Sequence, residues 1–362
     1  MRYLGEKAMA QRKKKDNISG ASWDAAYASV RAAHKEVFIG AVEDVEDPAT
    51  ISTGSLGLDY NLGGGLQMGR IMEIYGPPYT GKSSTSLSII SQYQKREDAK
   101  KVVYADVERS FNRKMAAGFG VDVSPDNFII IRAFTGEDYI DILENLVKSG
   151  EIGIFVVDSV AGLIPPAEAE GSISNDHMGA HAKLMSRAIL RLVPVVSQTQ
   201  TLGIFINQIR QQIGRYGDPG RPTGGYALAF YSSYRIEVKG GTSKDSRIVD
   251  SKGLVVGHRM EYWVEKNKTA PPFRKYGIDL IYGRGFDINA EILDWATDLG
   301  VVEKLGTWFN YKGDRLGQGR SNACAFLQSR PEVYQSLREE VENIMGRGPI
   351  NDIFEELPET PE

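Results

Sequence analysis

The stretch RIMEIYGPPYTGKSSTSLSIISQYQ, residues 70–94, decides how the rest of the chain is interpreted. Its mostly apolar start predicts a β-strand over residues 70–75, and the segment after Gly81 predicts a helix. Between them, residues 76–83 match the phosphate-binding pattern G-x-x-x-x-G-K-[ST] in the strand–loop–helix context that it requires. Glycines let backbone N–H groups turn toward phosphates, and the helix N-terminus adds positive potential. The alternative is a glycine-rich turn that binds nothing.

The pattern predicts a nucleotide site with ATP and Mg²⁺ as its ligands. Lys82 is expected to bring charge to the β- and γ-phosphates, and Ser83 to offer its hydroxyl to Mg²⁺. The other residues of this stretch that we expect to contact the nucleotide are Gly76, Pro77, Pro78, Tyr79, Thr80, Gly81 and Ser84.

Two carboxylates follow apolar runs that are typical of buried strands. Asp158 ends the run IFVVD, where an acid at the carboxyl end of a parallel strand can hold Mg²⁺ through water. Glu108 follows the run over residues 102–105 and is the candidate for polarising the attacking water, because a free carboxylate near the γ-phosphate can accept its proton. A helix-capping or surface role explains Glu108 equally well from the residues alone.

Composition limits the class of protein. The chain has 362 residues, 41% of them hydrophobic, which is enough for a full core in two or three domains. The formal charge of −4 gives no sign of nucleic-acid binding, so any DNA site must be a local basic patch. The single cysteine, Cys324, excludes an internal disulfide framework. With no signal-peptide pattern and no long uninterrupted apolar stretch, we expect a cytoplasmic protein without a membrane segment.

The sequence pattern divides the chain into four regions. Residues 1–48 contain a basic cluster and a helical stretch that Ser22 is expected to cap, and they are assigned to oligomerisation. Residues 49–285 alternate apolar runs with helical patterns, which predicts an α/β fold with a mostly parallel central sheet. Residues 286–348 predict a small α+β domain, and residues 349–362 an acidic, disordered tail. The further expected elements are strands over residues 101–105, 127–132, 152–157 and 202–207, and a helix over residues 290–306.

Several blocks, in the same order along residues 51–322, resemble the bacterial RecA recombinase family. They are ISTGSLGLDYNLGGGLQMGRIMEIYGPPYTGKSS, VVDSVAGLIPPAEAEG, DHMG, FINQIR, GGYALAFY, KNKTAPPF and LIYGRGF. The resemblance implies a RecA-type P-loop ATPase core that assembles into helical filaments on single-stranded DNA and pairs them with double-stranded DNA. It also implies a place in recombination, DNA repair and the SOS response to DNA damage.

The resemblance implies roles for four polar residues. Glu108 takes the place of the family's catalytic glutamate. Gln208 takes that of the glutamine that senses the γ-phosphate and signals to the DNA loops; by pattern alone it is a polar residue that ends a strand. Lys266 and Lys268 match lysines that reach the ATP of the neighbouring subunit and stabilise transition-state charge. Without the family, a solvated turn would be the preferred interpretation of both lysines.

Four further residues are assigned to the nucleotide by the same resemblance. Tyr282 and Gly283 match a segment that lines it. Asn112 and Met115 stand where the family has an aspartate that contacts the base and an aromatic residue that stacks on adenine. These two departures, with a shorter acidic tail, indicate a divergent member of the kind that a phage or mobile element encodes.

Two glycine-rich segments, residues 170–179 and 209–225, resemble the family's DNA-binding loops. Their glycines let backbone amides approach phosphates, arginines supply charge, and an apolar or aromatic side chain can stack between bases. The residues expected at DNA are Met178, Lys183, Arg210, Arg215, Tyr216, Arg221, Gly224 and Gly225. The alternative is a long surface loop without function, although such loops are uncommon inside a compact α/β domain unless functional or disordered.

Two other functions are compatible with these residues. One is a hexameric, helicase-like DNA motor with the same core, which would form closed rings instead of open filaments. The other is a mediator that binds single-stranded DNA and uses ATP as a switch with little turnover, against which the presence of Glu108 argues.

Overall fold

The computed structural model describes residues 22–34, 39–40, 47–170, 179–210, 221–241, 243–250 and 252–346. Met178, Arg215 and Tyr216, the basic cluster at residues 12–15 and the acidic tail at residues 349–362 lie outside the described residues. The chain divides into two compact units, Met1–Asp47 and Pro48–Glu362, and each is described by itself.

The first unit contains helix α2 (Trp23–Ala33). The Ser22 side chain accepts a hydrogen bond from the backbone N–H of Ala25, which confirms the predicted N-cap. No residue of α2 is buried, and its exposed Trp23 stacks on Tyr27 with ring centroids 5.8 Å apart. Among the described residues of this unit, the contacts of the helix include its cap, this ring pair and a hydrogen bond from the Tyr27 hydroxyl to the carbonyl of Ile39 at 3.2 Å.

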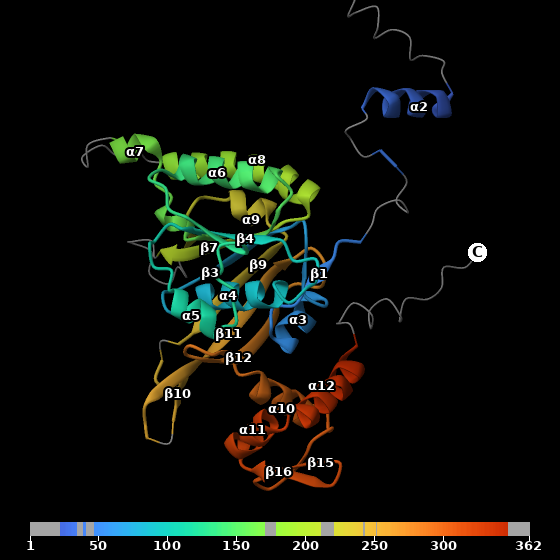
Figure 1. Ribbon diagram of the computed structural model, residues 1–362, viewed down its shortest axis with the longest axis vertical. Coiled ribbons are helices and arrows are strands. Elements are labelled where there is room, and N and C mark those ends of the chain that lie inside the picture. Colours follow the sequence, from blue (N-terminus) through green and yellow to red (C-terminus); the bar gives the residue numbers. More distant parts are fainter. Residues whose placement is uncertain are drawn as a thin grey trace, which may run out of the picture. The chain divides into compact units, whose positions relative to one another are not determined.

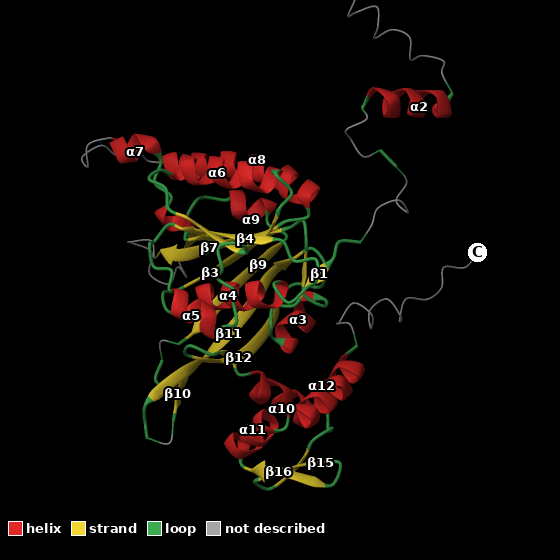
Figure 2. Cartoon of the chain, in the orientation of Figure 1, coloured by secondary structure: helices red, strands yellow, loops and turns green. Residues whose placement is uncertain are grey.

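An eleven-stranded sheet lies at the centre of the second unit (Figures 1 and 2). Its strands are β3 (Ile71–Gly76), β4 (Lys101–Asp106), β5 (Phe128–Ile131), β6 (Ile152–Asp158), β7 (Leu202–Arg210), β8 (Arg221–Pro222), β9 (Tyr234–Gly240), β10 (Arg247–Val249), β11 (Val255–Asn267), β12 (Arg274–Ile281) and β13 (Gly285–Phe286).

The strand order is β13-β12-β11-β9-β3-β7-β6-β4-β5, with β10 paired to β11 and β8 to β7. Strands β9, β3, β7, β6, β4 and β5 run parallel to their neighbours in that order, and the pairs β9–β11, β11–β12 and β12–β13 are antiparallel. The mostly parallel sheet and its five expected strands are confirmed. The antiparallel extension was not predicted, because its strands carry many polar residues and no crossover helix separates them.

Helices cover both faces of the sheet (Figure 1). On one face lie α3 (Leu56–Leu62), α4 (Lys82–Tyr93) and α5 (Arg113–Gly118), and on the other α6 (Gly136–Lys148), α8 (Ala180–Thr199) and α9 (Ala227–Tyr231). Strand β6 shows why: Ile154 and Val156 pack in the core on the α4 side, whereas Phe155 and Val157 pack on the α6–α8 side. Alternate side chains of a strand point to opposite faces, so a strand covered on both faces must be apolar throughout.

Shorter elements complete this part of the unit: β1 (Thr50–Ile51), β2 (Leu66–Gln67), the 3₁₀ turn η2 (Val160–Gly162) and α7 (Pro166–Glu170). Along the described ranges, no helix combines the length and the apolar character that crossing a membrane requires.

A small α+β region with its own apolar core follows the sheet. It consists of α10 (Ile288–Asp298), β14 (Glu303–Leu305), β15 (Trp308–Tyr311), β16 (Asp314–Gln318), α11 (Arg320–Ser329) and α12 (Pro331–Met345). The helix expected over residues 290–306 is wrong in its second half, since α10 ends at Asp298 and residues 303–305 form a strand. Gly300 explains the difference: its φ of 73° is left-handed, a conformation that ends helices and that glycine adopts without steric cost.

Glu291, on α10, joins this region to the core. Its carboxylate accepts hydrogen bonds from the Ser55 hydroxyl (2.5 Å) and from the backbone N–H groups of Gly57 (3.0 Å) and Leu56 (3.2 Å) at the N-terminus of α3. The Tyr276 hydroxyl donates a fourth, at 2.7 Å. Burial raises the pKa of Glu291 and these donors oppose the shift, so a carboxylate buried between two regions is satisfied from both of them.

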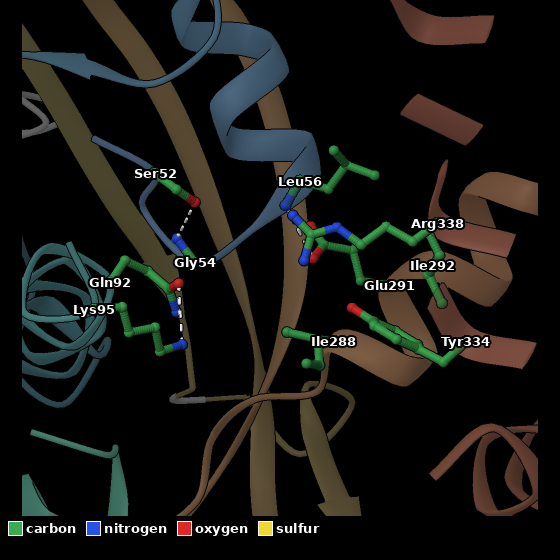
Figure 3. Close-up of a pocket in the computed structure, with 10 residues that line it drawn as sticks. All are labelled: Ser52, Gly54, Leu56, Gln92, Lys95, Ile288, Glu291, Ile292, Tyr334 and Arg338. Carbon is green, nitrogen blue, oxygen red and sulfur yellow. Dashed lines mark hydrogen bonds between the residues drawn. The ribbon is translucent and has the colours of Figure 1, made fainter. Parts of the chain in front are cut away.

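A cavity of about 90 Å³ lies beside this junction (Figure 3). Gln92 of α4 and Lys95, in the turn that follows α4, line one side of it, and Tyr334 and Arg338 of α12 line the other. Lys95 donates a hydrogen bond to Gln92 (3.2 Å), and Arg338 pairs with Glu342 (2.6 Å). Since both cations are engaged by residues close to them in the chain, this cavity is a packing gap between two regions and not a charged binding site.

Candidate active site

A larger cavity, of about 610 Å³, opens at the carboxyl ends of the parallel strands. Gly76 at the end of β3 lies in register with Gln208 of β7, and Asp106 of β4 lies in register with Asp158 of β6. In open α/β sheets, ligands bind at this edge. The predicted site residues that line the cavity are Pro78, Tyr79, Thr80, Gly81, Lys82, Ser83, Ser84, Glu108, Met115, Asp158, Gln208 and Tyr282.

The phosphate-binding loop runs from the end of β3 into the N-terminus of α4. Gly81 caps α4 in the left-handed conformation, with φ of 92°. Lys82 is buried, and its ammonium donates to the carbonyl oxygens of Gly76 (3.0 Å) and Pro77 (2.5 Å). Burial lowers the pKa of Lys82. The loop thus directs a cation and a helix N-terminus at one point, which is the arrangement that binds phosphate.

Ser83 and Asp158 lie side by side at the edge of this loop. The Ser83 hydroxyl donates to Oδ2 of Asp158 at 2.7 Å, and the Tyr104 hydroxyl donates to the same oxygen at 2.6 Å. Burial raises the pKa of Asp158, and these two hydroxyls oppose the shift. Adjacent hydroxyl and carboxylate oxygens fit Mg²⁺, which takes one or two protein oxygens together with phosphates and water. In the described ranges no cluster of three or more His, Cys, Asp or Glu forms a metal cage.

Glu108 and Gln208 meet across two different strand ends. Gln208 donates from its side-chain nitrogen to Oε1 of Glu108 at 2.6 Å, and the Ser159 hydroxyl donates to the same oxygen. On its other side, the backbone carbonyl of Gln208 accepts a hydrogen bond from the N–H of Thr223 at 3.3 Å. One residue therefore contacts the carboxylate in the cavity and also the far end of the segment over residues 209–225.

Six residues assigned to the nucleotide or its neighbour do not line the cavity: Gly76, Pro77, Asn112, Gly283, Lys266 and Lys268. Asn112 caps α5, where its side-chain oxygen accepts the Met115 N–H at 3.0 Å. Gly283 packs its carbonyl oxygen against Gly118. Lys266 donates to the carbonyls of Ala229 and Phe230 at the end of α9, both at 2.8 Å, and Lys268 is exposed.

Of the residues assigned to DNA, five lie within the described part of the structure: Lys183, Arg210, Arg221, Gly224 and Gly225. Lys183 is exposed in the first turn of α8. Arg210 and Arg221 lie opposite each other in the antiparallel pair β7–β8, which brings the two ends of the second segment together. Gly225 packs against α8, since a Cβ on Gly225 would lie 3.0 Å from the Cβ of Ala182. Gly224 lies beside it and packs against η2 and α8.

Four further residues line the cavity that the sequence did not single out: Ser110, Ile206, His258 and Leu280. Ser110 and Ile206 lie within a few residues of Glu108 and Gln208, so strand ends were a usable signal for them. His258 and Leu280 lie opposite each other on β11 and β12. Nothing in the local pattern of those strands indicates that they reach the phosphate-binding loop.

Comparisons with known proteins agree with this arrangement. A family model described as the RecA N-terminal domain matches residues 33–287, and one described as the RecA C-terminal domain matches residues 290–346. Protein RecA of Lactobacillus acidophilus is 42% identical over 300 residues, 82% of this chain and 80% of the relative. Protein RecA of Nitratiruptor sp. is 41% identical over 325 residues, 87% of this chain and 91% of the relative. Protein RecA of Azospirillum lipoferum is 42% identical over 327 residues, 90% of this chain and 87% of the relative.

Proposed function

The chain belongs to the RecA family, and from that premise we propose that it is a DNA-dependent ATPase that forms filaments on single-stranded DNA and catalyses homologous pairing and strand exchange. The contact that carries the proposal is the hydrogen bond between Glu108 and Gln208. It connects a carboxylate of the nucleotide cavity to the strand end from which the arginine-containing segment, residues 209–225, departs.

ATP binds with its phosphates at the loop over residues 76–83. Lys82 supplies positive charge to the β- and γ-phosphates, and the N-terminal N–H groups of α4 add to it. Ser83 directly, and Asp158 through water, would hold Mg²⁺, which when bound draws charge from the phosphate oxygens. Tyr282 and Met115 line the same cavity and contact the nucleoside.

Glu108 takes the proton from the attacking water. Attack of that water on the γ-phosphorus breaks the bond to the β–γ bridging oxygen and releases ADP and phosphate. A carboxylate that accepts from both Ser159 and Gln208 is held in place, and an oriented base contributes more to the rate than a mobile one.

Gln208 makes DNA affinity depend on the nucleotide. The γ-phosphate and Glu108 compete for the side-chain amide of Gln208. The backbone carbonyl of Gln208 is hydrogen-bonded to Thr223, so a movement of Gln208 also shifts the far end of the segment. Arg210, Arg215 and Arg221 contact the phosphates of single-stranded DNA without reading sequence, and Met178 or Tyr216 stacks on bases. Lys266 and Lys268 act on the ATP of the neighbouring subunit, and residues 1–48 contribute to assembly.

The test is ATP turnover with and without single-stranded DNA, followed by a homologous pairing assay on the same preparation. We expect turnover to rise with DNA and pairing to require ATP. Lys82→Ala is the matched control, because it removes the charge at the phosphates and should abolish both activities. Pairing by the Lys82→Ala variant, or none by the wild type, contradicts the proposal. Closed rings in electron micrographs would favour a hexameric motor, and pairing support without turnover would favour a mediator.

A further inference from the structure

His258 forms part of the wall of the nucleotide cavity and has no role in the scheme above. It lies on β11, opposite Leu280 of β12, and only 3% of its surface is exposed. A histidine buried this deeply in a ligand cavity must satisfy two ring nitrogens, since even the neutral imidazole carries one donor and one acceptor.

One ring nitrogen of His258 contacts Tyr282. Nδ1 lies 3.2 Å from the Tyr282 hydroxyl, and the two ring centroids are 5.6 Å apart. The Tyr282 side chain is otherwise half exposed, and the backbone contact of Tyr282 that the structure gives is to Val256 on the neighbouring strand. The orientation of the exposed Tyr282 ring therefore depends on this hydrogen bond.

The other ring nitrogen faces the phosphate-binding loop. A Cβ placed on Gly241 would lie 2.9 Å from the carbonyl oxygen of Tyr79 and 3.0 Å from Nε2 of His258, so both atoms border the same small space. Nε2 is buried and has no hydrogen-bond partner among the described residues. The imidazole thus lies between the loop that binds phosphates and the tyrosine that contacts the nucleoside.

Burial favours the neutral form of the His258 imidazole. Burial lowers the pKa of His258, the backbone of Thr80 opposes this in part, and no charged side chain contributes. When Nδ1 of the neutral ring accepts from the Tyr282 hydroxyl, Nε2 carries the proton. The Thr80 backbone, which belongs to the phosphate-binding loop, is the other group that acts on this ring.

We propose that His258 is a positioning residue of the nucleotide site, which holds the Tyr282 ring against the nucleoside and links it to the phosphate-binding loop at Tyr79. This inference rests on the proposed nucleotide site. The two halves of the ligand are bound by different groups. His258 acts on the nucleoside half through Tyr282, whereas Lys82 and the loop amides bind the phosphate half without His258.

The experiment is a double-mutant cycle on the full chain with two ligands, ATP and inorganic tripolyphosphate. His258→Phe keeps a ring and removes both nitrogens, and Tyr282→Phe removes only the hydroxyl. Each is expected to weaken ATP binding about five- to tenfold, the effect of one hydrogen bond, and the double variant no more than either single one. Tripolyphosphate affinity should stay within about twofold in all three variants, because Lys82 and the loop amides bind the phosphates and are unchanged.

Several outcomes would overturn the inference. Additive losses in the cycle would mean that the two residues act independently, and an equal loss of tripolyphosphate would mean that His258 only supports the loop. His258→Gln keeps hydrogen-bonding groups and should retain ATP affinity within about threefold, so a folded His258→Gln variant as weak as His258→Phe also contradicts it. A wild-type protein that binds neither ligand would instead contradict the nucleotide site itself.

Discussion

Glu108 projects from a turn that the buried carboxylate of Asp106 fixes. One oxygen of Asp106 accepts the backbone N–H groups of Ser110 (2.8 Å) and Phe111 (3.2 Å), and the other accepts Nε (2.9 Å) and Nη2 (2.7 Å) of Arg132. The backbone N–H of Glu108 itself donates to the carbonyl of Asp158 at 3.2 Å. The candidate base is therefore positioned by the ends of β4, β5 and β6 together.

Replacing Glu108 by Gln is expected to separate binding from turnover. The amide keeps the size of the side chain and most of its hydrogen bonds, so ATP affinity should stay near that of the wild type. Turnover should fall at least about a hundredfold, because the amide cannot accept the proton of the attacking water. Single-turnover hydrolysis and ATP affinity, measured on the same variant, check this.

The matched control is Glu151→Gln, the same chemical change at an exposed position just before β6. It should hydrolyse ATP like the wild type. Normal hydrolysis by Glu108→Gln would remove Glu108 from the role of base.

At the scale of elements, helix α3 depends on carboxylates at its N-terminal end. Asp59, in its first turn, accepts hydrogen bonds from the side chains of Ser52 (2.5 Å) and Thr53 (2.6 Å) and from the Thr53 backbone N–H (2.7 Å). Burial raises the pKa of Asp59 from 3.8 to about 6, the three hydrogen bonds oppose the shift, and the nearby Glu291 adds to it. Asp59 therefore keeps its proton to a higher pH in the folded protein than in the unfolded chain.

The pH dependence of stability follows from the direction of this shift. Between pH 4 and 6 the folded state binds more protons at Asp59 than the unfolded state, so stability falls as pH rises through about 6. A shift of this size corresponds to at most about 3 kcal/mol, and to less where water reaches the side chain. Asp59→Asn should therefore flatten the change of the thermal unfolding midpoint between pH 4 and 7, whatever it does to the midpoint itself.

Asp126→Asn, at an exposed turn, is the control for Asp59→Asn and should keep the wild-type slope. An Asp59→Asn variant with an unchanged slope would show that Asp59 titrates alike in the folded and unfolded states.

At the scale of the whole molecule, one chain does not bring all the assigned catalytic groups to one cavity. Lys266 and Lys268 lie at the end of β11 and just after it, away from the residues that line the cavity. Lys266 also holds the C-terminal carbonyls of α9, and burial lowers its pKa. The backbone N–H of Lys268 donates to the carbonyl of Ser233 (3.1 Å), but its side chain is exposed and makes no hydrogen bond or ion pair with the described residues. Lys268 is therefore the cleaner probe of action on a neighbouring subunit.

We expect Lys268→Ala to lower DNA-stimulated turnover at least about tenfold and basal turnover much less, because a cation that acts across an interface needs assembly. Mixing it with an excess of Glu108→Gln should restore activity, since one mixed interface then combines an intact Glu108 with an intact Lys268. ATP turnover over a series of mixing ratios checks this. Lys252→Ala, at an exposed position of the β10–β11 hairpin, should need no rescue. No recovery at any ratio would count against action in trans.

The sequence by itself determined the features that are local in the chain. The loop over residues 76–83, the strands that precede Glu108 and Asp158, and the Ser22 cap all follow from periodicity, glycine spacing and side-chain chemistry within a few residues. The parallel direction of the strands also follows, because apolar runs that alternate with helices can be buried only in a sheet covered on both faces. The break at Gly300 is a local signal too, but it was overridden by the helical pattern on either side of it.

Only the tertiary structure decided which distant segments meet. Glu108 and Gln208 are bonded because β4 and β7 end at the same edge of the sheet, and Glu291 reaches the start of α3 from a separate region. His258 and Leu280 enter the nucleotide cavity because β11 and β12 continue the sheet beyond β9. Which distant strands pair depends on how whole faces pack and on long-range hydrogen bonds, and the residues near each strand do not specify its partner.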